Sequence, residues 1–91
     1  MNNNDLKALR ARADALDEAF LARLAERIHT VRKIGTWKKE NHADITQKDR
    51  ERLVYANWVK HANDFDLDLK FLEKLFALVV EESKRVQEDI S

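Results

Sequence analysis

LKALRARADALDEAFLARLAERIHTVRKIGTWK, residues 6–38, is the segment that determines the fold of this chain. On an α-helix with about 100° per residue, its apolar positions fall on one arc of about 80°, the width of a buried stripe. The apolar residues of this arc, called the seam below, are Leu9, Ala13, Leu16, Phe20, Leu24, Val31 and Ile34. Two cations, Arg27 and Lys38, fall on the same arc.

The two cations occupy the helix face that is expected to be the driest. Since an unpaired buried charge costs several kcal/mol, Arg27 and Lys38 need anions to meet them. The seam therefore predicts a pocket for a small, multiply anionic ligand. The alternative is that both side chains reach solvent, or pair with Glu51 or Glu81.

The composition indicates one small all-α domain over residues 1–91. There is a single Gly and no Pro, and hydrophobic residues make up 44% of the chain. Such a sequence lacks turn residues for hairpins and is rich in helix formers. Because 17 Lys and Arg balance 17 Asp and Glu, we expect no bulk binding to nucleic acid or to an acidic membrane.

The chain has no cysteine and no apolar run long enough to cross a bilayer. Its start, MNNNDLKALR, lacks the apolar core of a secretory signal. These features predict a cytoplasmic protein. His29, His42 and His61 show no metal-ligand spacing, so we expect no metal and no cofactor.

The first helix is expected to run from Leu6 to about residue 41, with Asn4 or Asp5 as its N-cap. At roughly 50 Å, it is too long to be covered by the rest of the chain, which predicts a homodimer. Arg10 lies 17 residues before Arg27, about 25 Å along the helix. Arg10 therefore either serves a ligand in the partner chain or is a solvated arginine at the dimer edge.

Two further helices are expected, at about residues 47–62 and 69–89. Thr46 is the predicted N-cap of the second helix, with Asp49 in the capping-box position, and Asp68 is the predicted cap of the third. The second helix has Val54, Trp58 and Ala62 on one side. The predicted buried face of the third helix comprises Phe71, Leu72, Leu75, Phe76, Val79, Val80, Val86 and Ile90.

Four polar residues lie near these apolar faces. Ser83 and Gln87, at i and i+4, follow one edge of the third helix, and Arg50 and Glu51 are neighbours near the start of the second. Such residues commonly mark the boundary of a core or form a weak surface ion pair. No arrangement typical of nucleophilic catalysis accompanies them in the sequence.

Taken together, these positions resemble the all-helical AroQ class of chorismate mutases. LKALRARADALDEAFLARLAER is similar to the opening pattern of that family, LxxLRxxIDxxDxxLLxLLxER, and Lys38 follows Arg27 by eleven residues. The resemblance continues through DRERL (residues 49–53) and LFALVVEESKRVQ (residues 75–87). It implies an intertwined homodimer of three-helix chains, with two active sites shared between the subunits.

The resemblance also implies how the substrate's two carboxylates are bound. Arg27, with Arg10 of the other chain, would bind them, and Arg50 and Ser83 would assist.

The remaining contacts implied by the resemblance surround the ring and the breaking bond. Lys38 and Gln87 would contact the ether oxygen, and Glu51 the ring hydroxyl. Val31 and Ile34 would line the pocket.

The implied reaction is the Claisen rearrangement of chorismate to prephenate, on the way to phenylalanine and tyrosine. This one-step reaction needs no nucleophile, metal or cofactor. The protein must hold the flexible dianion in its reactive conformer and stabilise the charge that grows on the ether oxygen.

One departure from the family pattern leaves the identity of the substrate undecided. Gln47 stands where better-known members have an acidic residue near the ring hydroxyl. Gln can donate and accept hydrogen bonds, so hydroxyl binding can survive the change. An isochorismate pyruvate lyase or a 4-amino-4-deoxychorismate mutase on the same scaffold is therefore an alternative. A different alternative is a non-catalytic helical dimerisation module whose cations pair across the interface.

Overall fold

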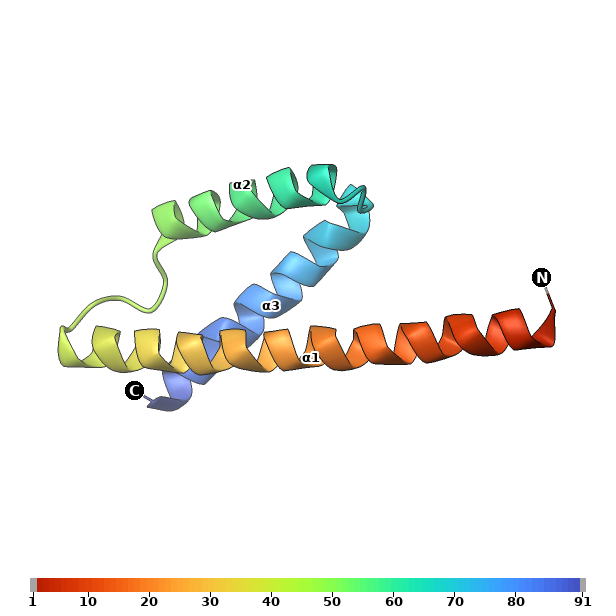
Figure 1. The fold of residues 1–91 in the computed structure, drawn as a ribbon. Coiled ribbons are helices and arrows are strands. Elements are labelled where there is room, and N and C mark those ends of the chain that lie inside the picture. Colours follow the sequence, from red (N-terminus) through yellow and green to blue (C-terminus); the bar gives the residue numbers. More distant parts are fainter. Residues whose placement is uncertain (1, 91) are drawn as a thin grey trace. The chain divides into compact units, whose positions relative to one another are not determined.

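The computed structural model describes residues 2–90, which form three α-helices (Figure 1). They are α1 (Asn3–Glu40), α2 (Lys48–Asp64) and α3 (Leu69–Ile90). The prediction of an all-α fold with a very long first helix is confirmed. The described residues up to Thr30 form one compact unit, and those from Val31 onward form a second. Among the helices of residues 2–90, none has the length and apolarity that crossing a membrane requires.

Helix α1 begins earlier than predicted, because Asn2 caps it. The Asp5 backbone N–H donates to Asn2 Oδ1 at 3.0 Å, and the Asn2 N–H donates to Asp5 Oδ2 at 3.0 Å. This reciprocal pair satisfies two backbone donors and places an anion in the first turn, where the helix dipole favours it. The prediction of Asn4 or Asp5 as N-cap was wrong.

The starts of the other two helices differ in their capping. Asp68 caps α3 as predicted, since its Oδ2 accepts from the Phe71 N–H at 2.9 Å. Thr46, however, is not the N-cap of α2. That position belongs to Gln47, which has an extended backbone (φ −125°, ψ 93°) and makes no side-chain cap bond. The amide of Gln47 is therefore not used for capping.

The seam is less buried in this chain than predicted. Leu9, Leu16 and Phe20 of the first unit are 50–55% exposed, and Leu24 is half-buried. The first unit consists of one helix, which has no second helix within that unit to cover its apolar face. Burial of this part of the seam requires contacts from outside the unit.

The second unit has a small core. Its buried apolar residues are Val31, Ala62, Leu72 and Val86. Phe76 of α3 makes edge-to-face contacts with Tyr55 and Trp58 of α2, with ring centroids 5.1 and 5.2 Å apart. Ile34 and Phe71, which were predicted to be buried, are 45% and 58% exposed. The helices of this unit leave about half of each of these two side chains uncovered.

Gly35 allows the end of α1 to approach α3 closely. A Cβ at position 35 would lie 3.0 Å from Gln87 Cγ, 3.2 Å from Gln87 Cα and 3.3 Å from Ile90 Cδ1. The second of these atoms belongs to the backbone of α3. A side chain at position 35 would therefore displace the helix as well as the Gln87 side chain.

Gly35→Ala should destabilise the protein by about 1 kcal/mol. Overpacking costs about 1–3 kcal/mol, which exceeds the gain of about 1 kcal/mol in helix propensity. Denaturant unfolding would measure the change, with Thr36→Ala as the control, because Thr36 is an exposed neighbour on α1. The control should unfold at or above the wild-type midpoint. A Gly35→Ala variant as stable as the wild type would contradict this view of the contact.

Candidate active site

Lys38 is a buried cation at the carboxyl end of α1. Its Nζ donates to Gln87 Oε1 at 2.8 Å and to the Ile45 backbone carbonyl at 2.7 Å. An ammonium group has three N–H donors. These two bonds therefore hold the ammonium between α3 and the loop after α1, and leave a third N–H for a ligand.

Gln87 is a buried amide on α3, and its contacts fix its orientation. Its carbonyl oxygen must face Lys38, because an ammonium can only donate. The Nε2 group then lies on the other side and donates to the Ser83 backbone carbonyl at 3.1 Å. An amide nitrogen can only donate, so the Gln87 amide accepts from Lys38 on one side and donates on the other.

Two opposing effects act on the charge of Lys38. Burial lowers the pKa of the Lys38 ammonium, because the charged form loses hydration. The negative charge of Glu51 on α2 partly offsets this and raises the Lys38 pKa. Glu51 therefore lies near enough to Lys38 for its charge to act on the ammonium group.

Glu51 forms an ion pair that joins α2 to α3. Lys84 Nζ lies 2.9 Å from Glu51 Oε1, and the two side chains are 34% and 35% exposed. The sequence suggested that Arg50 and Glu51 could form an ordinary surface pair, and the structure gives Glu51 a partner on another helix. Arg50 is exposed near the start of α2.

The other predicted residues of the second unit differ in burial. Val31 is buried, and Ile34 is 45% exposed. Ser83 is half-buried, and its hydroxyl donates to the Val79 carbonyl at 2.7 Å within α3. Gln47 is exposed at the start of α2.

Arg10 and Arg27 belong to the first unit. Arg10 is exposed, whereas Arg27 is half-buried, and this burial lowers the pKa of its guanidinium. Their binding of the same ligand as Lys38 stays a prediction.

Sequence reasoning missed two groups next to the predicted residues. The Ile45 carbonyl has no sequence signal, because every residue carries such a group. Lys84 is one of many charged residues on a helix surface, and no spacing along the chain relates it to Glu51. Only the tertiary structure brings either group to the site.

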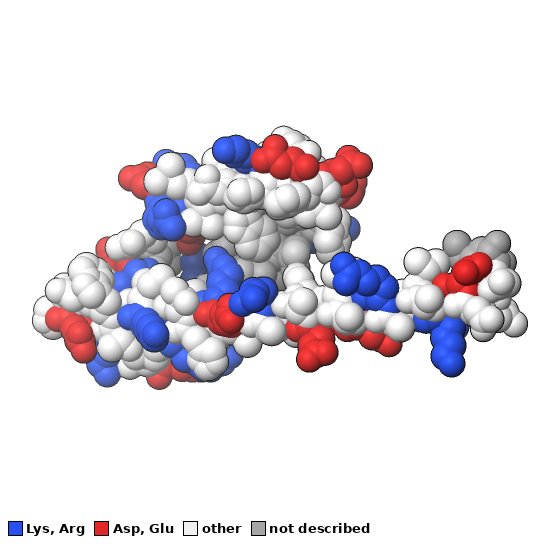
Figure 2. All heavy atoms as spheres, in the orientation of Figure 1, with Lys and Arg blue, Asp and Glu red and all other residues white. Residues whose placement is uncertain are grey.

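The second unit thus joins a buried cation, a fixed amide and a carboxylate. Such a set suits an oxygen-rich anion, and stabilisation of charge on a ligand oxygen needs only the first two groups. Within residues 2–90, no group of three or more His, Cys, Asp and Glu side chains is arranged to hold a metal. On the face shown in Figure 2, basic and acidic side chains are interspersed.

A family model described as chorismate mutase type II matches residues 9–88 of this chain. The chain therefore belongs to the chorismate mutase type II family, and the resemblance seen in the sequence is confirmed. The match includes most of α1, all of α2, most of α3 and every residue of the predicted site.

Individual relatives fall into two groups. The bifunctional chorismate mutase/prephenate dehydratase of Escherichia coli K12 is 34% identical over 96% of this chain, which spans 22% of that protein. The 4-amino-4-deoxychorismate mutase of Streptomyces pristinaespiralis is 33% identical over 92% of this chain and 65% of its own length. The Streptomyces venezuelae protein of the same name is 33% identical, with 93% of this chain and 82% of its own length covered.

Proposed function

We propose that this chain is a chorismate mutase that converts chorismate to prephenate by a Claisen rearrangement. The buried pair of Lys38 and Gln87 is the observation that carries this proposal. A buried cation next to an amide suits the stabilisation of negative charge on an oxygen placed against both groups.

The rearrangement is a single step in which the ether bond breaks as a carbon–carbon bond forms. Negative charge grows on the ether oxygen during this step. Lys38 Nζ and Gln87 Nε2 would both donate to that oxygen. Because both groups are held in place before the substrate binds, little reorganisation is needed at the moment of reaction.

The substrate is a dianion, and arginines would bind its two carboxylates. We assign this role to Arg27 and the partner subunit's Arg10, with Arg50 and Ser83 assisting. Bidentate contacts of this kind suit the planar guanidinium group. They would hold the flexible substrate in its compact reactive conformer.

The ring hydroxyl would be bound by Glu51, with Gln47 beside it. A carboxylate repels the carboxylates of the substrate and accepts from a hydroxyl, so Glu51 suits the neutral end of the ligand. The Gln47 amide, which is not used for capping, can also contact that hydroxyl. Val31 and Ile34 would line the pocket.

The functional unit would be a homodimer with shared sites, each chain folding as one domain over residues 1–91. Support comes from the large apolar residues of α1 that are exposed in the single chain, among them Leu9, Leu16, Phe20 and Ile34. A second copy would bury them and bring its own Arg10 to the site. We expect a cytoplasmic enzyme of phenylalanine and tyrosine synthesis that needs no cofactor and no metal.

A second candidate function is that of a 4-amino-4-deoxychorismate mutase. Two observations favour it, namely the Streptomyces relatives and the neutral Gln47. Comparing kcat/KM for chorismate, 4-amino-4-deoxychorismate and isochorismate decides between the candidates. Our proposal expects chorismate to be converted most efficiently, and a preference for either analogue would overturn it.

The activity should fall at alkaline pH, and the fall should begin below pH 10.5. Lys38 acts as a cation, and burial lowers its pKa from the ordinary value of 10.5. As the pH rises through that lowered pKa, the ammonium loses its proton and its charge. Between about pH 6 and 8 the rate should stay level, since Gln87 does not titrate.

A profile of kcat/KM against pH checks this expectation, with circular dichroism at each pH to confirm that the helices persist. Full activity above pH 10.5 would show that the Lys38 charge is not used.

A further inference from the structure

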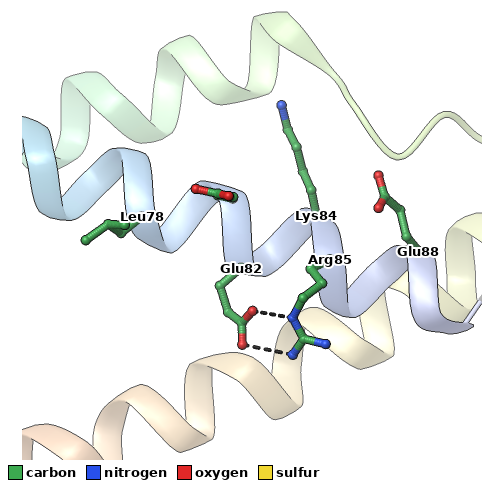
Figure 3. Close-up of a pocket in the computed structure, with 6 residues that line it drawn as sticks. Leu78, Glu82, Lys84, Arg85 and Glu88 are labelled. Atoms are coloured by element: carbon green, nitrogen blue, oxygen red, sulfur yellow. Dashed lines mark hydrogen bonds and ion pairs between the residues drawn. The ribbon is translucent and has the colours of Figure 1, made fainter.

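The ion pair between Lys84 and Glu51 differs from the other pairs of α3. The Lys84 side chain extends from α3 toward α2 (Figure 3), and its Nζ meets Glu51 there. The neighbouring Arg85 instead pairs with Glu82 and Asp89 of its own helix. Lys84 is therefore the cation of this part of α3 that reaches a residue of the candidate active site.

Glu51 interacts with two cations that belong to two other helices. Its negative charge raises the pKa of Lys38 on α1, and its Oε1 binds Lys84 on α3. The two side chains of the second pair are about one-third exposed, so solvent screens it less than a fully exposed pair. The bond to Lys84 uses one carboxylate oxygen of Glu51 and restricts the direction of the other.

We propose that Lys84 is a positioning residue for Glu51 and sets the preference for a hydroxyl over an amino group on the ring. This inference rests on the proposed function, in which Glu51 accepts from the ring hydroxyl. Lys84 fixes the Glu51 carboxylate by binding Oε1, and it balances the charge of that carboxylate.

The charge balance explains the preference. The analogue 4-amino-4-deoxychorismate carries an amino group in place of the hydroxyl, and aliphatic amines are largely protonated near neutral pH. An unpaired Glu51 would attract that ammonium strongly. With Lys84 bound, the attraction is offset by repulsion between two cations, whereas a neutral hydroxyl is little affected.

The test compares Lys84→Met, Lys84→Gln and Lys84→Arg with the wild type on both substrates. Lys84→Met and Lys84→Gln should each lower the ratio of kcat/KM for chorismate to that for the amino analogue about tenfold. Both variants should also have a lower kcat/KM for chorismate. This loss should appear mainly as a higher KM, because the hydroxyl contact is made in both the ground and the transition state. Lys84→Arg should keep the wild-type ratio, since it retains the charge.

Arg85→Met is the matched control, because it removes a neighbouring cation and its ion pairs from the same helix. It should leave the ratio unchanged. A ratio that stays within about twofold of wild type in both charge-removing Lys84 variants would overturn the inference alone. So would an equal change in the control. A wild-type protein that converts neither substrate would overturn the proposed function, and the role of Lys84 with it.

Discussion

Lys38→Ala should lower kcat/KM for chorismate by about 100- to 1,000-fold, the usual effect of removing a donor aimed at a developing oxyanion. The change removes the buried positive charge and also frees Gln87 Oε1 and the Ile45 carbonyl from their donor. Because Gln87 would then lose one of the two contacts that fix its orientation, both donors to the ether oxygen are affected. Steady-state kinetics on the purified variant would measure the loss.

Lys39→Ala is the matched control for this variant. Lys39 is the adjacent lysine on α1, is exposed, and donates to the Ile90 carbonyl at 3.0 Å. Its removal should change kcat/KM by less than about twofold. Circular dichroism should show the same helix content in both variants. A Lys38→Ala enzyme with less than about a tenfold loss would remove Lys38 from the role that we assign to it.

The second large effect concerns the sharing of sites between chains. Arg10→Ala and Lys38→Ala homodimers should each be nearly inactive, because every site in them lacks one group. After the two proteins are mixed and exchange subunits, half of the dimers should contain one of each chain. Each such heterodimer has one intact site, so the mixture should recover about a quarter of the wild-type activity.

The control for this mixture pairs Lys38→Ala with the double variant that carries both changes. No site in that mixture contains Lys38, so it should stay inactive. Subunit exchange would be verified by native mass spectrometry. Verified heterodimers without recovered activity would contradict the assignment of Arg10 to the partner's site.

The helices could be predicted from the sequence, whereas some of their ends could not. The apolar period of residues 6–38 and the absence of proline determine α1, and Asp68 is a strong local cap. The caps at Asn2 and Gln47 were missed, because several neighbouring residues could each begin a helix. The choice among such neighbours depends on small differences in backbone energy.

The candidate site was predictable to the extent that it depends on helical faces. Lys38 and Gln87 lie on faces that the apolar pattern turns inward, and the structure brings them within 2.8 Å. The Ile45 carbonyl and Lys84 were not predictable, because their contacts arise from how the loop and α3 pack. The exposure of Phe20 and Ile34 in the single chain was not predictable either. In our proposal, the surface that would cover them belongs to a second chain.

The most direct test of the proposed function is the identity of the product formed from chorismate. The purified protein would be incubated with chorismate, and NMR would identify the product as the substrate disappears. The Lys38→Ala variant is the matched control. Our account predicts prephenate, formed far faster by the wild type than by the variant. Chorismate that persists unchanged, or that disappears equally fast with both proteins, would contradict it.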